Sequence, residues 1–337
     1  MNRITLNISD YKLQCLFPGF DYLLKRRVAA RFAPYVQEND SSAHGRLSVQ
    51  PITMREHEHT EPQLEKRIKN WIEGYLSKFP FAPDPEAERN SLFSRIRPFL
   101  SVPEINRHLH GMPGDEPVSV LTIDQSFLVQ NQTTGDSVLF LKSGFRWVKP
   151  FWDYSPISVI GKAVYYVAAT SLPLSNTIML HGTGIEREKA GLLFLGSSGS
   201  GKTTIARFCR EEEVLGDDAI LLKKKDNHYV ISSCPFNSGK SIYLKESRLA
   251  MVLFIEQDTY HDLEEISSAT AGSMILKNHI HYFRNFSADA VRSTFQQVAD
   301  LCRTVPFYRL HFKKEPSFFT KIDQQLTEPC ACRGPGG

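Results

Sequence analysis

The residues whose types and spacing have the clearest chemical meaning run from Gly196 to Thr203, in the order Gly-Ser-Ser-Gly-Ser-Gly-Lys-Thr. This order fits the phosphate-binding pattern G-x-x-x-x-G-K-[S/T], in which small residues let successive backbone N–H groups surround a phosphate. The apolar run 192–195 precedes the loop, and a helical pattern with Ile205 and Phe208 follows it. A Gly-rich turn without a ligand is the alternative, and this strand–loop–helix setting favours a nucleotide site.

The loop residues have separate expected roles. Lys202 would reach the β- and γ-phosphate oxygens of a nucleoside triphosphate, and Thr203 would hold Mg²⁺ through its hydroxyl. The positive end of the helix that begins near Lys202 would add to the attraction for phosphate. The residues assigned to nucleotide binding are Gly196, Ser197, Ser198, Gly199, Ser200, Gly201, Lys202, Thr203 and Thr204.

Two adjacent carboxylates, Asp217 and Asp218, stand at the head of the apolar run 219–222. Mg²⁺ prefers oxygen ligands, so Asp217 could hold the ion while Asp218 accepts the proton of an attacking hydroxyl. Only fifteen positions separate Lys202 from Asp217, enough for a helix to run out along a sheet and for the chain to return to the same end. A turn or a cap is the other common use of such an Asp pair.

Apolar patterns predict the elements that must position these groups. We expect a buried helix at 157–170, a short strand at 177–181, a glycine-broken turn at 182–184, and then the strand that leads into the loop. This part of the chain reads as an α/β P-loop core.

The Lys-rich segment 223–228 lies between two apolar runs, 220–222 and 229–232, which should therefore pair antiparallel and make the sheet mixed. Lys223, Lys224 and Lys225 suit a solvated hairpin tip, and recruitment of an acidic substrate is the functional alternative.

A further buried strand is expected at 248–257, where Glu256 stands at the polar end. The Glu256 carboxylate either contacts the metal site or simply marks the point where the strand ends in solvent. An amphipathic helix at 287–302 and a strand at 306–312 complete the predicted core. The helix residues expected on its buried side are Val291, Phe295, Val298 and Cys302.

The first 150 residues read as a strand-rich α+β module. Alternating patterns predict strands within 4–17, 117–130 and 137–147, with a hairpin turn at 133–136, and one amphipathic helix is expected at 63–79. We therefore predict an N-terminal module at 1–150, a catalytic domain at 151–328 and a flexible tail at 329–337.

Two pairs of residues have side chains that could bind a metal ion, but their sequence context favours a simpler interpretation of each. His108 and His110 share one side only on a strand, and the surroundings favour a surface loop. Cys330 and Cys332 give two soft ligands where a zinc site needs four. A C-terminal tail without a specific function is therefore favoured over a reactive or intermolecular thiol pair.

The whole-chain composition is that of an ordinary globular protein. The 337 residues include 40 Lys and Arg against 37 Asp and Glu, a net charge of +3 that gives little reason to expect a nucleic-acid or membrane partner. The absence of a long apolar run or an apolar leader, together with six scattered cysteines, favours a cytoplasmic protein with reduced thiols. The oligomeric state stays open, homo-oligomers included.

These motifs together resemble the catalytic domain of HPr kinase/phosphorylase and its relatives, which belong to the phosphoenolpyruvate-carboxykinase-like nucleotide-binding fold. The resemblance rests on His181-Gly182 before the loop strand, on Gly196–Thr204 and on Leu215-Gly-Asp-Asp218. It covers roughly residues 155 to 315. Two further similar segments are 235–240 and 254–256.

The resemblance implies transfer of the γ-phosphate of ATP, or another nucleoside triphosphate, to a serine hydroxyl on a peptide or small protein. It also implies that Thr203 and Asp217 serve Mg²⁺, that Asp218 is the general base, and that His181 orients or charge-balances the carboxylates. Phosphoryl transfer needs little beyond such positioning and charge stabilisation.

This chain departs from the bifunctional enzymes of that family. Its loop ends Lys202-Thr-Thr rather than Lys-Ser-Glu, and the basic Pro-Gly-Arg-Asn segment linked to phosphorolysis is absent from the sequence. The departures favour the divergent, peptide-modifying branch, in which the N-terminal module would bind a precursor peptide. A small-metabolite kinase and a nucleotide-dependent switch or binding module are the alternative functions.

Overall fold

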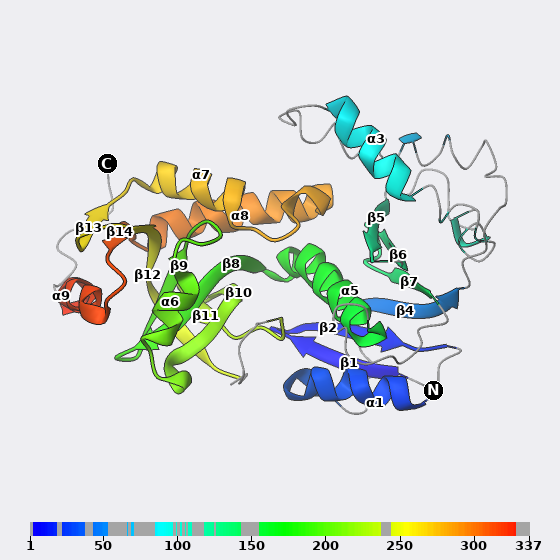
Figure 1. The fold of residues 1–337 in the computed structure, drawn as a ribbon, viewed down its shortest axis with the longest axis horizontal. Helices are drawn as coiled ribbons and strands as arrows, with labels where there is room; N and C mark the ends of the chain where they lie inside the picture. The colour runs from blue at the N-terminus through cyan, green and yellow to red at the C-terminus, as the bar shows by residue number, and fades with distance from the viewer. Residues whose placement is uncertain are drawn as a thin grey trace. The chain divides into compact units, whose positions relative to one another are not determined.

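The computed structural model describes residues 3–18, 22–37, 43–52, 85–96, 118–124, 126–142, 155–236 and 244–327, with isolated positions between 66 and 109. The chain divides into two compact units (Figure 1). The N-terminal unit is Met1–Ser175 with Tyr282–Val291, and the C-terminal unit is Asn176–His281 with Arg292–Gly337. Both units combine helices with a mixed β-sheet, so the protein is α/β.

The sheet of the N-terminal unit has the strand order β3-β1-β2-β4-β7-β6-β5. Strand β4 pairs in parallel with β2 and β7, and the other pairs are antiparallel. Its strands are β1 (Arg3–Ile8), β2 (Tyr11–Leu16), β3 (Val36–Gln37), β4 (Gly45–Ile52), β5 (Val118–Ile123), β6 (Ser126–Asn131) and β7 (Ser137–Lys142). Among the described residues, the longer helices of this unit are α1 (Tyr22–Arg31), α3 (Pro85–Ile96) and α5 (Pro156–Ser171).

The strand-rich character expected for this unit is confirmed. The run 4–17 forms two strands, because Ser9 and Asp10 adopt left-handed backbone conformations that reverse the chain between them. The predicted turn at 133–136 joins β6 to β7. The predicted helix at 63–79 lies almost entirely outside the described residues.

The predicted apolar helix at 157–170 is confirmed as α5. Its first turn is capped by Ser155, whose hydroxyl accepts a hydrogen bond from the Ser158 N–H at 3.1 Å, and Pro156 opens the helix. Among the described residues, the segment Pro156–Ser175 alone is long and apolar enough to cross a membrane, yet 72% of its apolar window is buried. Burial to this extent is typical of a core helix.

Helix α5 belongs to the N-terminal unit, whereas the boundary near residue 150 would have placed it in the catalytic domain. Its Tyr166 contacts the Ser119 hydroxyl of β5, and its Thr170 donates a hydrogen bond to Gln130 of β6 at 2.9 Å. The later segment Tyr282–Val291 also belongs to this unit. A single cut in the sequence therefore cannot separate the two units.

His108 does not lie in the surface loop that the sequence favoured. Residues 107–109 are helical, and the His108 ring packs edge-on against Phe140 with 5.4 Å between ring centroids. Burial lowers the pKa of His108. His110, Cys330 and Cys332 lie outside the described residues.

The sheet of the C-terminal unit has the order β11-β10-β8-β9-β12-β14-β13, with a further pairing of β11 to β12. The pairs β9–β12 and β12–β14 are parallel, and the other pairs are antiparallel. Its strands are β8 (Thr177–Arg187), β9 (Ala190–Leu195), β10 (Val214–Lys225), β11 (His228–Ser232), β12 (Glu246–Gln257), β13 (Asp262–Glu265) and β14 (Phe307–Phe312). The helices are α6 (Lys202–Arg207), α7 (Ser268–Asn278), α8 (Ala288–Thr304), which begins in the other unit, and α9 (Phe319–Thr327).

The predicted antiparallel hairpin is confirmed, since Leu221 faces Ser232 and Leu222 faces Ile231 across β10 and β11. The predicted glycine-broken turn at 182–184 is wrong, because β8 continues through it to Arg187. A side chain at Gly182 would begin 2.8 Å from the Phe194 carbonyl oxygen, and one at Gly184 would begin 2.7 Å from Ile220. These glycines therefore let β8 lie close to its neighbours, and the chain reverses later, at Glu188 and Lys189.

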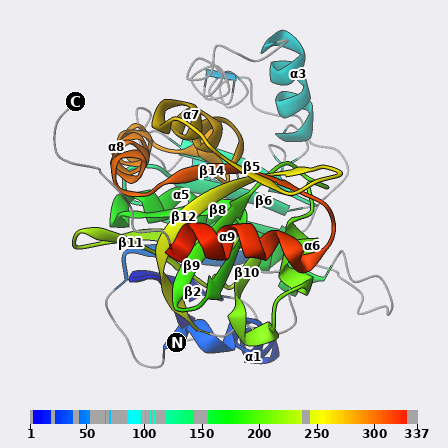
Figure 2. The same cartoon turned by 90° about the vertical axis from the view of Figure 1, so that its left-hand side faces the viewer.

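Helices cover both faces of this second sheet. On one face, apolar side chains of α7 and α8, including Ile275, Val298 and Leu301, pack on the strands. On the other face, Ile205 of α6 and Ile322 of α9 join the buried cluster, and Figure 2 shows α9 in front of the strands. Phe295 was expected on the buried side of α8, but 49% of its surface is exposed.

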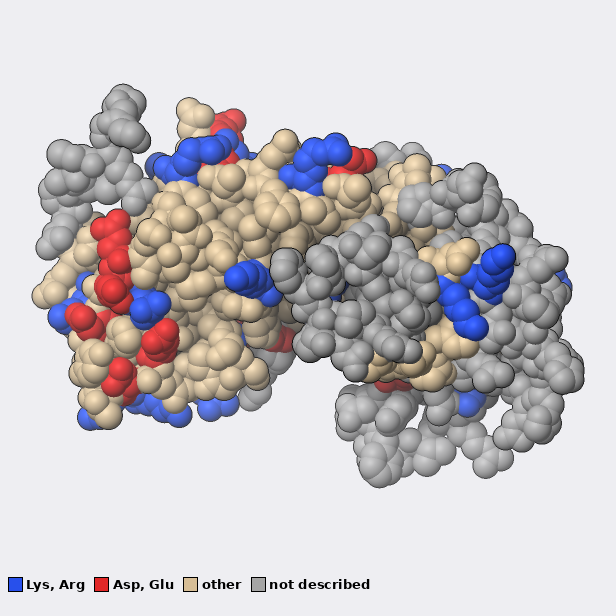
Figure 3. Space-filling model, turned by 90° about the horizontal axis from the view of Figure 1, so that it is seen from above, with Lys and Arg blue, Asp and Glu red and all other residues tan. Residues whose placement is uncertain are grey.

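The sheet ends at β13, an edge strand whose residues Asp262, Glu264 and Glu265 are exposed. Figure 3 shows acidic side chains gathered at the left end of the molecule, where Figure 1 draws this strand. Charged side chains on an edge strand discourage pairing with another chain.

Replacement of Leu193 by alanine tests the sheet core. The side chain is fully buried among strands and helices, so Leu193→Ala should lower the free energy of unfolding by about 2–5 kcal/mol. Leu244→Ala is the control, because Leu244 is 62% exposed. Urea unfolding of the full chain measures both, and equal effects would contradict the packing described here.

Candidate active site

The predicted phosphate loop connects β9 to α6 in the order that the sequence indicated. Gly199 and Gly201 have φ angles of 79° and 106°, which favour glycine. A Cβ atom on Gly201 would lie 2.6 Å from the Phe312 ring, whereas one on Gly199 would meet nothing within 4 Å. The loop therefore turns tightly against β14 at Gly201 and is open around Gly199.

Lys202 lies at the start of α6 and is buried, with 8% of its surface exposed. Its Nζ donates hydrogen bonds to the carbonyl oxygens of Gly196 at 2.8 Å and Ser197 at 2.9 Å. Burial lowers the pKa of Lys202, and the charges of Asp218 and Asp217 partly oppose that effect. The cation is thus held inside the loop, close to both carboxylates.

Hydrogen-bond register brings the carboxylates level with the loop. Strand β8 lies between β9 and β10, so Gly182 faces Leu195 on one side and Asp218 on the other. Two strand spacings separate β9 from β10, which is about 10 Å. The end of the loop strand and the carboxylate pair therefore share one level of the sheet.

Each carboxylate has its own partner on β8. The Thr183 hydroxyl donates a hydrogen bond to Asp217 Oδ1 at 2.8 Å. His181 Nδ1 lies 3.2 Å from Asp218 Oδ1, and that hydrogen bond lowers the pKa of Asp218. Asp218 also has a φ of 99° within strand β10, whereas the other described non-glycine residues with positive φ have values between 49° and 68°.

Two further histidines support His181. The backbone N–H of His181 donates a hydrogen bond to the backbone carbonyl oxygen of His279 at 2.8 Å. The His281 ring packs edge-on against the His181 ring, with 5.3 Å between ring centroids. Burial, followed by the nearby charge of His181, lowers the pKa of His279 and of His281 to about 4. Both rings are therefore neutral at pH 7.

The sequence did not identify His279, His281, Gln257 or Lys314 as site residues. Gln257 ends β12 and donates a hydrogen bond from Nε2 to the Gly199 carbonyl oxygen at 2.7 Å, so it fastens the open part of the loop. The position of Gln257 at the polar end of an apolar strand could have identified it. Strand β12 is the parallel neighbour of β9, so the carboxyl ends of both strands lie at the same edge of the sheet as the loop. His279 and His281 have the same i, i+2 spacing as His108 and His110, but nothing in the local sequence connects them with the loop.

The loop, His181 and the two carboxylates surround one pocket with a volume of about 430 Å³, and His279 and His281 lie outside its lining. Its lining is Ser198, Gly199, the residues from Gly201 to Thr204, His181, Asp217, Asp218, Gln257 and Lys314. Glu256, a predicted metal ligand, is not among them, and its Oε1 lies 3.2 Å from Arg309 Nε in an ion pair. The structure therefore brings together most of the predicted site residues, whereas Glu256 and the loop residues Gly196, Ser197 and Ser200 are outside the lining.

Part of the pocket could hold phosphate groups and a metal ion. The positive φ angles of Gly199 and Gly201 leave room beside the loop backbone, and the Thr203 hydroxyl and the Asp217 carboxylate are oxygen groups of the kind that Mg²⁺ prefers. Among the described residues, no group of three or more His, Cys, Asp or Glu side chains is arranged to hold a metal ion. Mg²⁺ commonly has only one or two protein carboxylates and completes its shell with phosphate oxygens and water.

Alanine at Gly201 should disturb the loop more than alanine at Gly199. Both positions have left-handed backbones, but only Gly201→Ala also meets the Phe312 ring. We expect Gly201→Ala to weaken binding of a fluorescent ATP analogue by about tenfold or more, and Gly199→Ala to have a smaller effect. The reverse order of effects would contradict this loop geometry.

Removal of the His181 ring should raise the pKa of Asp218 towards the ordinary value of about 4. Without the His181 ring, as in His181→Ala, Asp218 should protonate at higher pH, as measured by ¹³C NMR of labelled carboxyl groups. The lowered pKa of Asp218 in the intact protein contributes folding stability above the unfolded pKa, and that contribution is lost as the pH falls through the folded pKa. Asp300, whose pKa Lys224 lowers, is the internal reference that should not move. An unchanged Asp218 titration would contradict the assignment.

More than half of the chain matches a known protein family. A solved structure of the Hpr(Ser) kinase/phosphatase from Coxiella burnetii is similar at 14% sequence identity over 44% of this chain and 95% of its own, with a TM-score of 0.24. No curated protein matches the chain. The family described as SynChlorMet cassette protein ScmC matches residues 155–327, which is more than half of the 337 residues. The chain therefore belongs to the ScmC family of SynChlorMet cassette proteins.

Proposed function

We propose that this protein is an ATP- and Mg²⁺-dependent kinase that phosphorylates a serine of a peptide or small protein. The observation that carries the proposal is that Lys202 of the loop and the carboxylates Asp217 and Asp218 line the same pocket. A phosphate-binding loop alone fits a switch protein equally well. A carboxylate fixed by a histidine in the same pocket adds a group that can accept a proton.

In this proposal the loop binds the phosphates of ATP. Lys202 would exchange its bonds to the Gly196 and Ser197 carbonyl oxygens for bonds to phosphate, so that its charge meets the transferred group. Thr203 and Asp217 would hold Mg²⁺, which supplies charge neutralisation between the phosphates when bound. Gln257 would keep the Gly199 part of the loop in place.

Asp218 would orient the serine hydroxyl and receive its proton. Its lowered pKa keeps it ionised at neutral pH and therefore able to accept a hydrogen bond. A weak base suffices, because the loose transition state of phosphoryl transfer needs little activation of the nucleophile. The His181 ring would hold the carboxylate in position.

The choice of a serine acceptor on a peptide rests on the resemblance of the motifs to HPr kinase and its relatives. The phosphate pocket would bind the nucleotide and the reacting hydroxyl. The same lining residues would serve a hydroxyl of a peptide or of a small metabolite. The two acceptor classes are therefore separated by experiment.

Lys202→Ala and Asp218→Asn should each lower transfer by at least about a hundredfold, because each removes a group that acts on the reacting phosphate or hydroxyl. The measurement follows ³²P from γ-labelled ATP with Mg²⁺ into synthetic serine peptides, their alanine twins and a metabolite extract. The matched controls are Lys321→Ala and Asp262→Asn, whose side chains are 48% and 56% exposed outside the pocket.

Label on the serine peptides but not on their alanine twins would support the proposal. Label in metabolites would reassign the acceptor, and inorganic phosphate as the only product would contradict the kinase. An Asp218→Asn variant that retains full activity would remove Asp218 from the role of proton acceptor.

A further inference from the structure

Lys314 is the second lysine in the lining of the phosphate pocket, and the proposed transfer does not use it. It is exposed and follows β14 by two residues, whereas Lys202 is buried within the loop. Among the residues that the structure describes, Lys314 has no ion-pair partner. An ammonium group has three N–H donors and no acceptor, so Lys314 can offer both charge and donors to an anionic ligand.

Hydrogen bonds fix the segment that carries Lys314. The backbone N–H of Lys313 donates to His261 Nδ1 at 3.2 Å, and His261 Nε2 lies 2.9 Å from the Ser317 hydroxyl. The same histidine therefore holds the chain before and after Lys314. The Lys313 side chain has a partner of its own, since its Nζ lies 2.7 Å from Glu315 Oε1, and Lys313 is outside the pocket lining.

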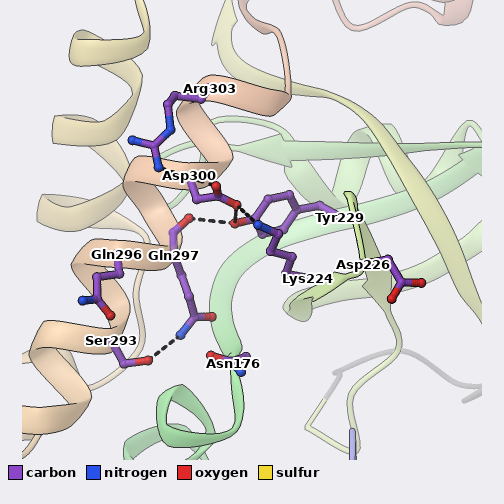
Figure 4. Close-up of a pocket in the computed structure, with 9 residues that line it drawn as sticks. All are labelled: Asn176, Lys224, Asp226, Tyr229, Ser293, Gln296, Gln297, Asp300 and Arg303. Carbon is purple, nitrogen blue, oxygen red and sulfur yellow. Dashed lines mark hydrogen bonds and ion pairs between the residues drawn. The ribbon is translucent and has the colours of Figure 1, made fainter.

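A second pocket of the same unit offers a contrast (Figure 4). Its Lys224 Nζ lies 2.7 Å from Asp300 Oδ2, and Arg303 Nη2 lies 3.5 Å from the other oxygen of that carboxylate. Asp226 is a second acid in its lining, so the charges of that pocket balance close together. In the phosphate pocket, by contrast, no carboxylate of the described residues pairs with Lys314.

Lys314 and the two carboxylates of the phosphate pocket lie on opposite sides of the loop. The strands run in the order β10, β8, β9, β12, β14, and the loop follows the middle strand, β9. Asp217 and Asp218 are on β10, two strands to one side, and Lys314 follows β14, two strands to the other side. The pocket therefore has an acidic side and a basic side with the loop between them.

This arrangement gives a bound nucleotide a direction. The proposed kinase needs the terminal phosphate of ATP next to Asp218, while the loop amides and Lys202 surround the phosphate before it. The phosphate attached to the ribose then lies on the side of Gln257 and Lys314, both of which line the pocket. There the Lys314 ammonium group can offset the phosphate charge.

We propose that Lys314 binds the phosphate chain near its nucleoside end, at a phosphate that ATP and ADP share. The nucleoside then lies on the β14 side of the loop, and the terminal phosphate of ATP lies on the side of Asp218. The proposal rests on the proposed function for the identity of the ligand. It is independent of the hydroxyl that accepts the phosphate.

Binding of fluorescent analogues of ATP and ADP to the full chain, measured by anisotropy, tests this contact. Lys314→Ala should weaken both analogues by the same factor, about threefold to tenfold. Lys314→Arg keeps the positive charge and should restore most of the affinity. Lys313→Ala is the matched control and should stay within about twofold of the natural chain, because Lys313 pairs with Glu315 outside the pocket.

Two results would overturn different parts of the proposal. A loss of affinity for the ATP analogue alone would place Lys314 at the terminal phosphate and reverse the direction of the nucleotide. Unchanged affinity for both analogues in Lys314→Ala, or an equal loss in Lys313→Ala, would overturn the contact itself. Thermal unfolding verifies that each variant folds, as expected for exposed side chains.

Transfer of ³²P then separates this proposal from the kinase assignment. A contact that is the same before and during transfer contributes uniform binding, so Lys314→Ala should raise KM for ATP by about threefold to tenfold and leave kcat within about twofold. Binding of both analogues that depends on Lys314, without any transfer, would contradict the kinase alone. Transfer with an unchanged KM for ATP in Lys314→Ala would contradict the Lys314 contact alone.

Discussion

The candidate site depends on the position of β8 between β9 and β10. Through β8, the end of the loop strand at Leu195 and the carboxylate at Asp218 face the same residue, Gly182. A slip of one residue in either pairing would turn side chains to the opposite face of the sheet and separate the carboxylates from the loop. The two halves of the site, which are distant in sequence, are therefore joined by backbone hydrogen bonds rather than by contacts between their own side chains.

Burial sets the electrostatics of this arrangement. Lys202 keeps a positive charge in a buried position by bonding to carbonyl oxygens of its own loop, with two carboxylates close by. His279 and His281 remain neutral, so they add packing and hydrogen bonds without adding charge. One pocket thus contains a buried cation, Lys202, and two carboxylates, Asp217 and Asp218.

Local patterns predicted the elements but not the register between them. The loop, the Asp pair, the hairpin of β10 and β11 and the helix α5 all have short-range signals in turn residues and apolar periodicity. Gly182 and Gly184 misled the prediction, because glycine marks both turns and strands that lie unusually close, and only the neighbouring strands distinguish the two cases. Gln257 and His281 reach the site through pairings that connect residues far apart in sequence, which a single sequence does not reveal.

The path of the chain has a consequence for dividing the protein into fragments. Residues 282–291 belong to the N-terminal unit, where Tyr282 packs edge-on against Tyr165 and Tyr166, yet they are flanked on both sides by the C-terminal unit. A fragment that begins at Asn176 would retain this segment and lose its aromatic partners, leaving a tyrosine ring exposed directly after His281. Separate expression of the C-terminal unit would therefore require a designed replacement for the segment, and the site histidines are the first residues that a poor replacement would disturb.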